Sequence, residues 1–160
     1  MILKKQHGAS AVEFAILLPF LVLLVFGMID FGFLMYNQQV LTNASREGAR
    51  AAIVGTCTYR LANTTDEQIS QIVIDYCIDP DDPTKKRLIT FASTNPDPVP
   101  DVNPSPSACT PGPGGTGLTV GDDVTVTVDW NYTFLLPSLL GYGPTKQLRA
   151  NTVMKMESAP

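Results

Sequence analysis

A single carboxylate near the start of a long apolar segment is the side chain with the clearest chemical consequence. Glu13 is followed by sixteen residues without a charge, from Phe14 to Ile29. A carboxylate that enters lipid unpaired is costly, and a partner ammonium group reduces that cost. Lys4 and Lys5 stand ahead of it, and Gly8 lies between these lysines and the glutamate. We interpret these residues together as parts of one membrane-related signal.

Catalysis and metal binding find little support in the rest of the chain. The only histidine, His7, precedes the apolar run, and the residues beyond it contain no Ser-x-x-Lys motif and no recognisable pair of catalytic acids. The three cysteines, Cys57, Cys77 and Cys109, do not have metal-ligand spacing. The sequence therefore predicts no enzyme activity, no metal and no cofactor.

The charge balance argues against a nucleic-acid partner. The chain has 11 Lys and Arg residues against 15 Asp and Glu residues. Without Lys4 and Lys5 the count is nine against fifteen, a net charge of −6 for the chain from Ala9. No patch combines basic and aromatic residues, so nucleic-acid binding is not expected.

The apolar segment has the length of one membrane crossing. Residues 9–29 form a helix of about 31 Å, and the hydrocarbon core of a bilayer is about 30 Å thick. We expect a single transmembrane helix over residues 9–30, with the basic N-terminus in the cytoplasm and the remainder exported. A cleaved secretory signal is the alternative, but the apolar core is too long and "GMIDFG" is a poor cleavage site.

Export would allow the cysteines to form a disulfide, because disulfides form in oxidising compartments. Three cysteines allow one bridge and leave one thiol. Cys77 falls on the apolar face of a predicted helix, which favours Cys57–Cys109 as the bridge.

The helical pattern continues beyond the membrane segment, over residues 31–55. Small and apolar residues recur there at spacings of three and four, which predicts one buried stripe on a continuous helix; they are Val40, Leu41, Ala44, Gly48, Ala51 and Ala52. The opposite face carries Arg46, Glu47 and Arg50, which form either a solvated surface or a subunit-docking patch.

Residues 56–160 are predicted to form a small α+β domain. A helix is expected from an N-cap at Thr65 to Cys77, a short strand over 87–93, and a Pro/Gly-rich surface loop over 94–117. Strict alternation predicts two long strands, over residues 123–134 and 147–156. The fold class is therefore α+β, with a long N-terminal helix whose outer half packs on a small antiparallel sheet.

The N-terminal signal resembles the class III signal of type IV pilin-like proteins. The resemblance implies that a prepilin peptidase cuts between Gly8 and Ala9 and removes the leader, residues 1–8. Glu13 then becomes the fifth residue of the mature chain, where this family's glutamate meets the N-terminal amine of a neighbouring subunit. Cleavage creates that amine, so the processing site and the assembly charge fit together.

More narrowly, the chain resembles the TadE-like family. The resemblance rests on residues 8–32, with Asp30 just before Phe31-Gly32, on "NASREGARAA" at residues 43–52, and on a C-terminal strand ending in "VMKME". It implies a pseudopilin or minor pilin needed to assemble a tight-adherence (Flp) pilus for adhesion and biofilm formation. The implied location is the bacterial inner membrane, and the implied partners are lipid, prepilin peptidase, other pilin and pseudopilin subunits and the assembly platform. Asp30 and the 46–50 patch are the candidate subunit contacts.

Two other functions stay open from the sequence. One is a membrane-tethered extracytoplasmic binding or sensing domain whose leader is never removed. The other is a pseudopilin of a related secretion machine, although "REGAR" at residues 46–50 favours the tight-adherence family.

Overall fold

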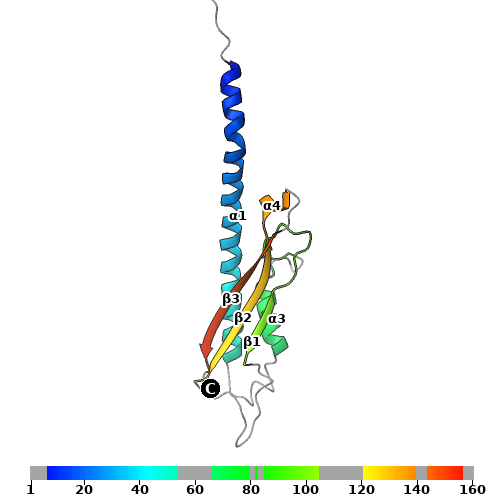
Figure 1. Cartoon of the computed structure of the whole chain (residues 1–160). Helices are drawn as coiled ribbons and strands as arrows, with labels where there is room; N and C mark the ends of the chain where they lie inside the picture. The colour runs from blue at the N-terminus through cyan, green and yellow to red at the C-terminus, as the bar shows by residue number, and fades with distance from the viewer. Residues whose placement is uncertain are drawn as a thin grey trace, which may run out of the picture.

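The computed structural model describes residues 7–53, 66–79, 82, 85–104, 121–139 and 144–156. A long helix, α1 (His7–Ile53), extends far beyond a small sheet domain that packs on its C-terminal half (Figure 1). This arrangement confirms the predicted α+β fold with a continuous N-terminal helix. The Thr65 cap lies outside the described residues.

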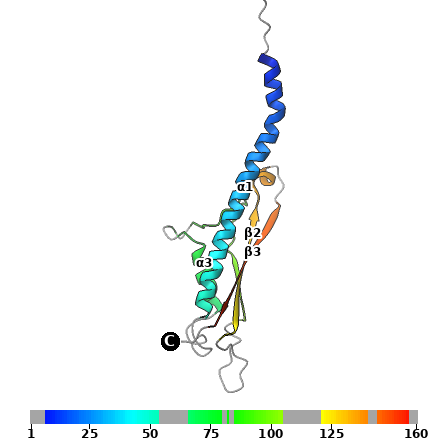
Figure 2. The ribbon, with the colours of Figure 1, turned by 90° about the vertical axis from the view of Figure 1, so that its left-hand side faces the viewer.

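Helix α1 continues through Pro19 without a break. Proline has no N–H to bond to the carbonyl four residues earlier, and such a gap commonly bends a helix. Figure 2 shows the apolar half of α1 inclined relative to the half that packs on the domain.

The sheet has three antiparallel strands in the order β1-β2-β3. They are β1 (Val99–Asn103), β2 (Asp123–Thr133) and β3 (Thr145–Lys155). The β2–β3 register is unbroken from Asp123↔Lys155 to Thr133↔Thr145. Helices α1 and α3 (Asp66–Tyr76) lie on one face of this sheet, and the short helix α4 (Leu135–Leu139) follows β2 (Figures 1 and 2).

The core lies between α1, α3 and the sheet. The alternating side chains predicted for β2 are buried on one face; they are Val124, Val126, Val128, Trp130 and Tyr132. Leu148 and Ala150 of β3 continue this face. Most of the predicted stripe on α1 is buried against it, and Ala51 is only half-buried.

The helix and sheet approach most closely at Gly48. A Cβ atom built there would stand 2.5 Å from Cγ2 of Val73 in α3 and 3.3 Å from Cγ1 of Val126 in β2. Both neighbours are β-branched and cannot easily swing away. Glycine at this position therefore permits α1 to touch two elements at once.

The predicted strand over residues 87–93 is wrong. The side-chain amide of Asn37, fully buried in α1, donates to the Ile89 carbonyl at 2.8 Å and accepts from the Ile89 N–H at 2.9 Å. The Asn95 amide donates to the Leu88 carbonyl. Side-chain amides thus satisfy backbone groups that a neighbouring strand would otherwise bond, so the segment is irregular.

The prediction that residues 94–117 contain no regular structure is also wrong, because β1 lies within them. Val102 is buried in the core, and β1 pairs with β2 from Val99↔Asp129 to Asn103↔Thr125. Pro100 is tolerated because an edge strand has one row of backbone groups facing away from the sheet. Pro100 within the strand, a proline on each side of it and a loop-like composition concealed this strand.

Candidate functional site

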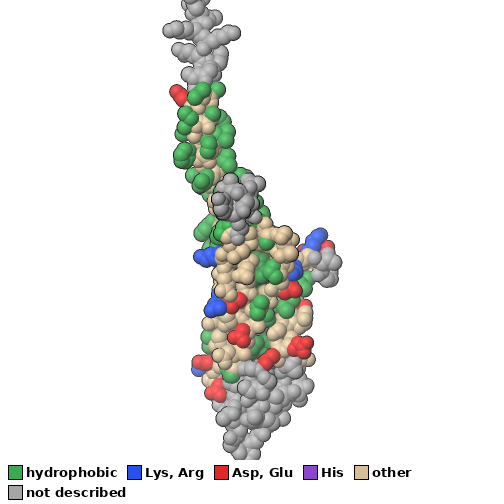
Figure 3. Space-filling view, turned by 45° about the vertical axis from the view of Figure 1, so that its right-hand side comes forward, with side chains coloured by type: hydrophobic (Ala, Val, Ile, Leu, Met, Phe, Trp, Pro, Cys, Tyr) green, Lys and Arg blue, Asp and Glu red, His purple; other side chains and the backbone are tan. Residues whose placement is uncertain are grey.

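The most apolar part of α1 is not buried by any other described part of the chain. Of the described helices, only α1 is long and apolar enough to cross a membrane; its most apolar 18-residue window has a mean hydropathy of 2.6 and none of that window is buried. Figure 3 shows hydrophobic side chains covering this part of the helix, whereas charged side chains are scattered over the domain. A helix in the core of a soluble protein would be buried instead, so this helix fits a single-pass membrane anchor.

Glu13 projects from this apolar half as an exposed side chain. Among the residues that the structure describes, none forms a hydrogen bond or ion pair with its carboxylate. In lipid such a group needs a partner from outside the described chain. The geometry is therefore consistent with an intermolecular role for Glu13.

The remaining parts of the predicted signal are only partly described. Gly8 and Ala9 lie in the first turn of α1, and Lys4 and Lys5 lie outside the described residues. Helical backbone at the Gly8–Ala9 bond does not by itself test cleavage. The processing site stays a prediction.

The predicted bridge Cys57–Cys109 also lies outside the described residues. Cys77 is a free thiol, 2% exposed, at the end of α3. Burial raises its thiol pKa to about 11, with a smaller opposing effect from Arg87. Cys77 is thus a packing residue rather than a reactive one, and the pairing of the other two cysteines stays a prediction.

Asp30 has a role within the chain that the sequence did not reveal. Its side chain is buried and accepts hydrogen bonds from the Tyr132 hydroxyl at 2.9 Å, from Leu135 N at 2.8 Å and from Leu136 N at 3.3 Å. Burial, and then the bond to Asp30, raise the pKa of Tyr132 above its usual value. Asp30 thereby joins α1 to β2 and caps the start of α4; its predicted role as a subunit contact is untested.

The polar patch on α1 borders a surface recess. Arg46, Glu47 and Arg50 are exposed, and the Arg50–Glu47 pair is long, at 3.9 Å. Together with Asn43, Tyr76 of α3 and Met154 of β3 they line a recess of about 380 Å³. The structure thus adds an aromatic and a thioether side chain to the predicted patch, from elements that are distant in sequence. Whether another subunit docks there stays a prediction.

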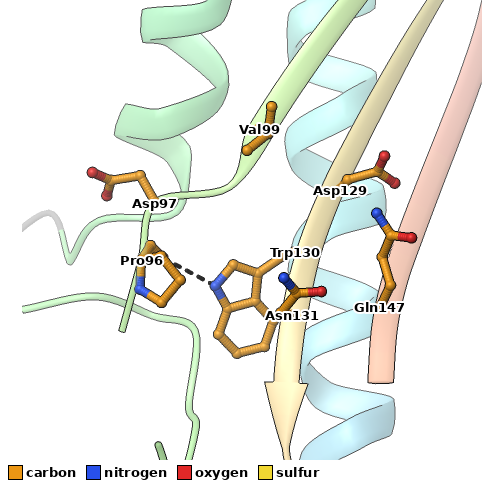
Figure 4. Close-up of a pocket in the computed structure, with 7 residues that line it drawn as sticks. All are labelled: Pro96, Asp97, Val99, Asp129, Trp130, Asn131 and Gln147. Carbon is orange, nitrogen blue, oxygen red and sulfur yellow. Dashed lines mark hydrogen bonds between the residues drawn. The ribbon is translucent and has the colours of Figure 1, made fainter. Parts of the chain in front are cut away.

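A second recess, of about 240 Å³, lies beside β1 and β2 (Figure 4). The Trp130 indole borders it and donates to the Pro96 carbonyl at 3.0 Å. Its two acids are already engaged, because Asp97 pairs with Lys86 and Asp129 pairs with Arg149. The recess therefore has no free pair of carboxylates for acid–base chemistry.

Metal ligands do not gather in the part of the chain that the structure describes. No group of three or more His, Cys, Asp and Glu side chains is placed there to hold a metal ion. Nothing in this region suggests a catalytic centre.

Comparison with known proteins gives one match. No curated protein and no solved structure matches the chain. The match covers the apolar half of α1 and most of its packed half, which are the segments that carry the exposed Glu13, the buried Asp30 and the Arg46–Arg50 patch. Residues 8–50 match the family model described as TadE-like protein, which confirms the resemblance inferred from the sequence and supports an association with the tight-adherence pilus system.

Proposed function

We propose that this protein is a pseudopilin or minor pilin that is needed to assemble a tight-adherence (Flp) pilus. It is anchored in the inner membrane by the apolar half of α1, with its N-terminus in the cytoplasm and its sheet domain exported. Prepilin peptidase removes residues 1–8, and the new amine at Ala9 becomes available to a neighbouring subunit. The proposed partners are other pilin and pseudopilin subunits and the inner-membrane assembly platform.

The observation that carries the proposal is the contrast within α1. One half exposes an apolar surface with Glu13, which has no partner among the described residues, and the other half holds a folded domain through small residues. A subunit that assembles through its helix needs this combination, because the apolar half must remain free for lipid and then for other helices. The folded domain distinguishes the chain from a short filament-forming pilin and favours an accessory subunit.

Processing is tested by intact-mass measurement of the membrane-bound protein from cells with an active peptidase. The expected mass is that of a chain starting at Ala9, and a bulky residue in place of Gly8 should block cleavage. A chain that still starts at Met1 would contradict the pilin proposal and support a tethered binding or sensing domain.

Assembly is tested with Glu13→Gln, which keeps the size and polarity of the side chain but removes its charge. Breaking a buried ion pair costs about 3–5 kcal/mol, so association should fall by orders of magnitude. Co-purification with other pilus subunits and piliation should be lost, while insertion, leader removal and domain folding stay normal. Glu67→Gln, at an exposed position of α3 outside the predicted subunit contacts, is the matched control and should assemble normally. Equal assembly by both variants would show that Glu13 has no pairing role.

A further inference from the structure

Helix α4 is held at the depth where the uninterrupted apolar run of α1 ends. The Asp30 carboxylate, at that point of α1, accepts hydrogen bonds from the first two backbone N–H groups of α4, at Leu135 and Leu136. The two helices are in contact, and Figure 1 shows α4 at the end of the sheet domain nearest the apolar half of α1. The position of α4 along α1 is thus set by Asp30.

The exposed apolar surface of α1 does not stop at this depth. Phe31 is 63% exposed, Met35 44% and Tyr36 45%. Residues 10–36 span about 40 Å of helix, close to the thickness of about 40–45 Å of a bilayer with its headgroup regions. A bilayer that covers these side chains extends about 9 Å past Asp30. The headgroup region takes up about 5–7 Å of that thickness on each side. The depth of α4 therefore falls at the boundary between the outer headgroup region and the hydrocarbon core.

The surface of α4 has the chemistry of such a location. Phe134 to Leu139 contains no charged residue, and the side chains from Phe134 to Pro137 are only half-buried. Lys146 is exposed and lies opposite Tyr132 in the β2–β3 register, and Tyr132 bonds to Asp30. No other described residue forms an ion pair with Lys146. Apolar side chains beside a free cation favour the surface of a bilayer with anionic lipids.

We propose that α4 and Lys146 form a second membrane contact, in which α4 lies at the boundary between the headgroup region and the hydrocarbon core of the bilayer that α1 crosses. The domain is then attached at two points, so it keeps one orientation about the α1 axis. This inference requires that α1 spans a membrane but does not depend on a role in pilus assembly, so the two proposals can fail separately.

The test uses the full chain in vesicles of phosphatidylcholine and phosphatidylglycerol. A diazirine amino acid replaces Leu136, and the matched control carries it at Val153, which is 54% exposed and pairs with Thr125 at the far end of β2. Eight residues separate Thr125 from Thr133 along the strand, or about 26 Å. After illumination, lipid adducts measured by mass spectrometry should be at least tenfold more abundant at Leu136. Equal yields at the two positions, or adducts at Leu136 with protein alone, would overturn the proposal.

A second probe position and a charge-reversal variant complete the test. If the probe at Leu136 shifts the unfolding midpoint followed by Trp130 fluorescence, the same probe at the exposed Lys146 replaces it and must show the same contrast with Val153. Lys146→Glu should lower the Leu136 lipid yield severalfold in vesicles with phosphatidylglycerol and leave it unchanged in pure phosphatidylcholine. If Lys146→Glu gave the same Leu136 lipid yield as the parent in both kinds of vesicle, Lys146 would not be part of the contact.

Discussion

The two halves of α1 share one backbone but have opposite surfaces. Before Asp30, large apolar side chains are exposed, such as Leu17 at 64% and Phe20 at 72%. After Asn37, the buried positions are mostly small, and Ala44 and Ala52 are fully inaccessible. The more hydrophobic half is thus the one that the other described residues leave uncovered. Burial of apolar surface stabilises a protein, so the exposed half must be covered by lipid or by other helices.

The comparison also separates two acids on the same helix. Glu13 is exposed and has no partner among the described residues, whereas Asp30 is buried and accepts three hydrogen bonds. Hydrophobicity alone would have treated both as charges at the ends of one apolar segment. Their different surroundings predict that Glu13 matters for association and Asp30 matters for folding.

The largest effect is expected from Gly48→Leu in the packed half. The new side chain cannot fit between Val73 and Val126, so the sheet domain should lose at least about 3 kcal/mol of stability or fail to fold. Trp130, the only tryptophan and buried in the core, reports unfolding by fluorescence in detergent-solubilised full chain. Gly32→Leu is the control, because a Cβ at Gly32 meets nothing within 4 Å. Similar unfolding midpoints for the two variants would contradict the close approach seen at Gly48.

Asp30→Ala should have the next largest effect. It removes the carboxylate that accepts hydrogen bonds from the buried Tyr132 hydroxyl and from two N–H groups of α4, which should cost about 2–3 kcal/mol. The thermal midpoint followed by Trp130 fluorescence should fall by about 10 °C or more. Glu13→Ala should leave this midpoint unchanged, since the domain does not touch Glu13. A midpoint that drops equally in both variants would refute the distinction between the two acids.

Asn37→Ala should destabilise the domain by about 2 kcal/mol, because both backbone groups of Ile89 lose their partner. Amide hydrogen exchange at Ile89 should accelerate in this variant, since its N–H is then unprotected. Gln39→Ala, at an exposed position two residues away, is the control and should exchange as the parent does. Unchanged protection at Ile89 would mean that the Asn37 amide does not hold this segment.

The smallest effect concerns Tyr132 and pH. Because the folded state raises the pKa of Tyr132, the unfolded state loses the phenolic proton first as the pH rises. The stabilising contribution is therefore complete below the ordinary tyrosine pKa of about 10 and is lost above it. Tyr132→Phe should lower the stability of the domain by about 1 kcal/mol near neutral pH. The stability of this variant should decline less steeply than that of the parent between pH 10 and 11. Parallel alkaline profiles for parent and variant would exclude this linkage.

The sequence predicted the elements in which one buried face gives the side chains a regular spacing. Strict alternation identified β2 and β3, and the spacing of small residues identified the packed face of α1, because each of these patterns reports one buried side. The length of the apolar run predicted the membrane segment, and two of the three blocks that carry the family resemblance lie between Gly8 and Ala52. For these elements, local side-chain order already encodes the environment.

Tertiary structure alone decided the features that depend on partners distant in the chain. The segment at residues 87–93 has the composition of a strand but is irregular, because Asn37 bonds Ile89 from 52 residues away. Val99–Asn103 has the composition of a loop but forms β1, because β2 offers it a free edge. Asp30 was a candidate subunit contact from the sequence, and its hydrogen bond to Tyr132, about a hundred residues later, is a contact that the sequence did not predict. Hydrogen-bond partners are chosen by proximity in the folded chain, and residue type and spacing do not specify that proximity.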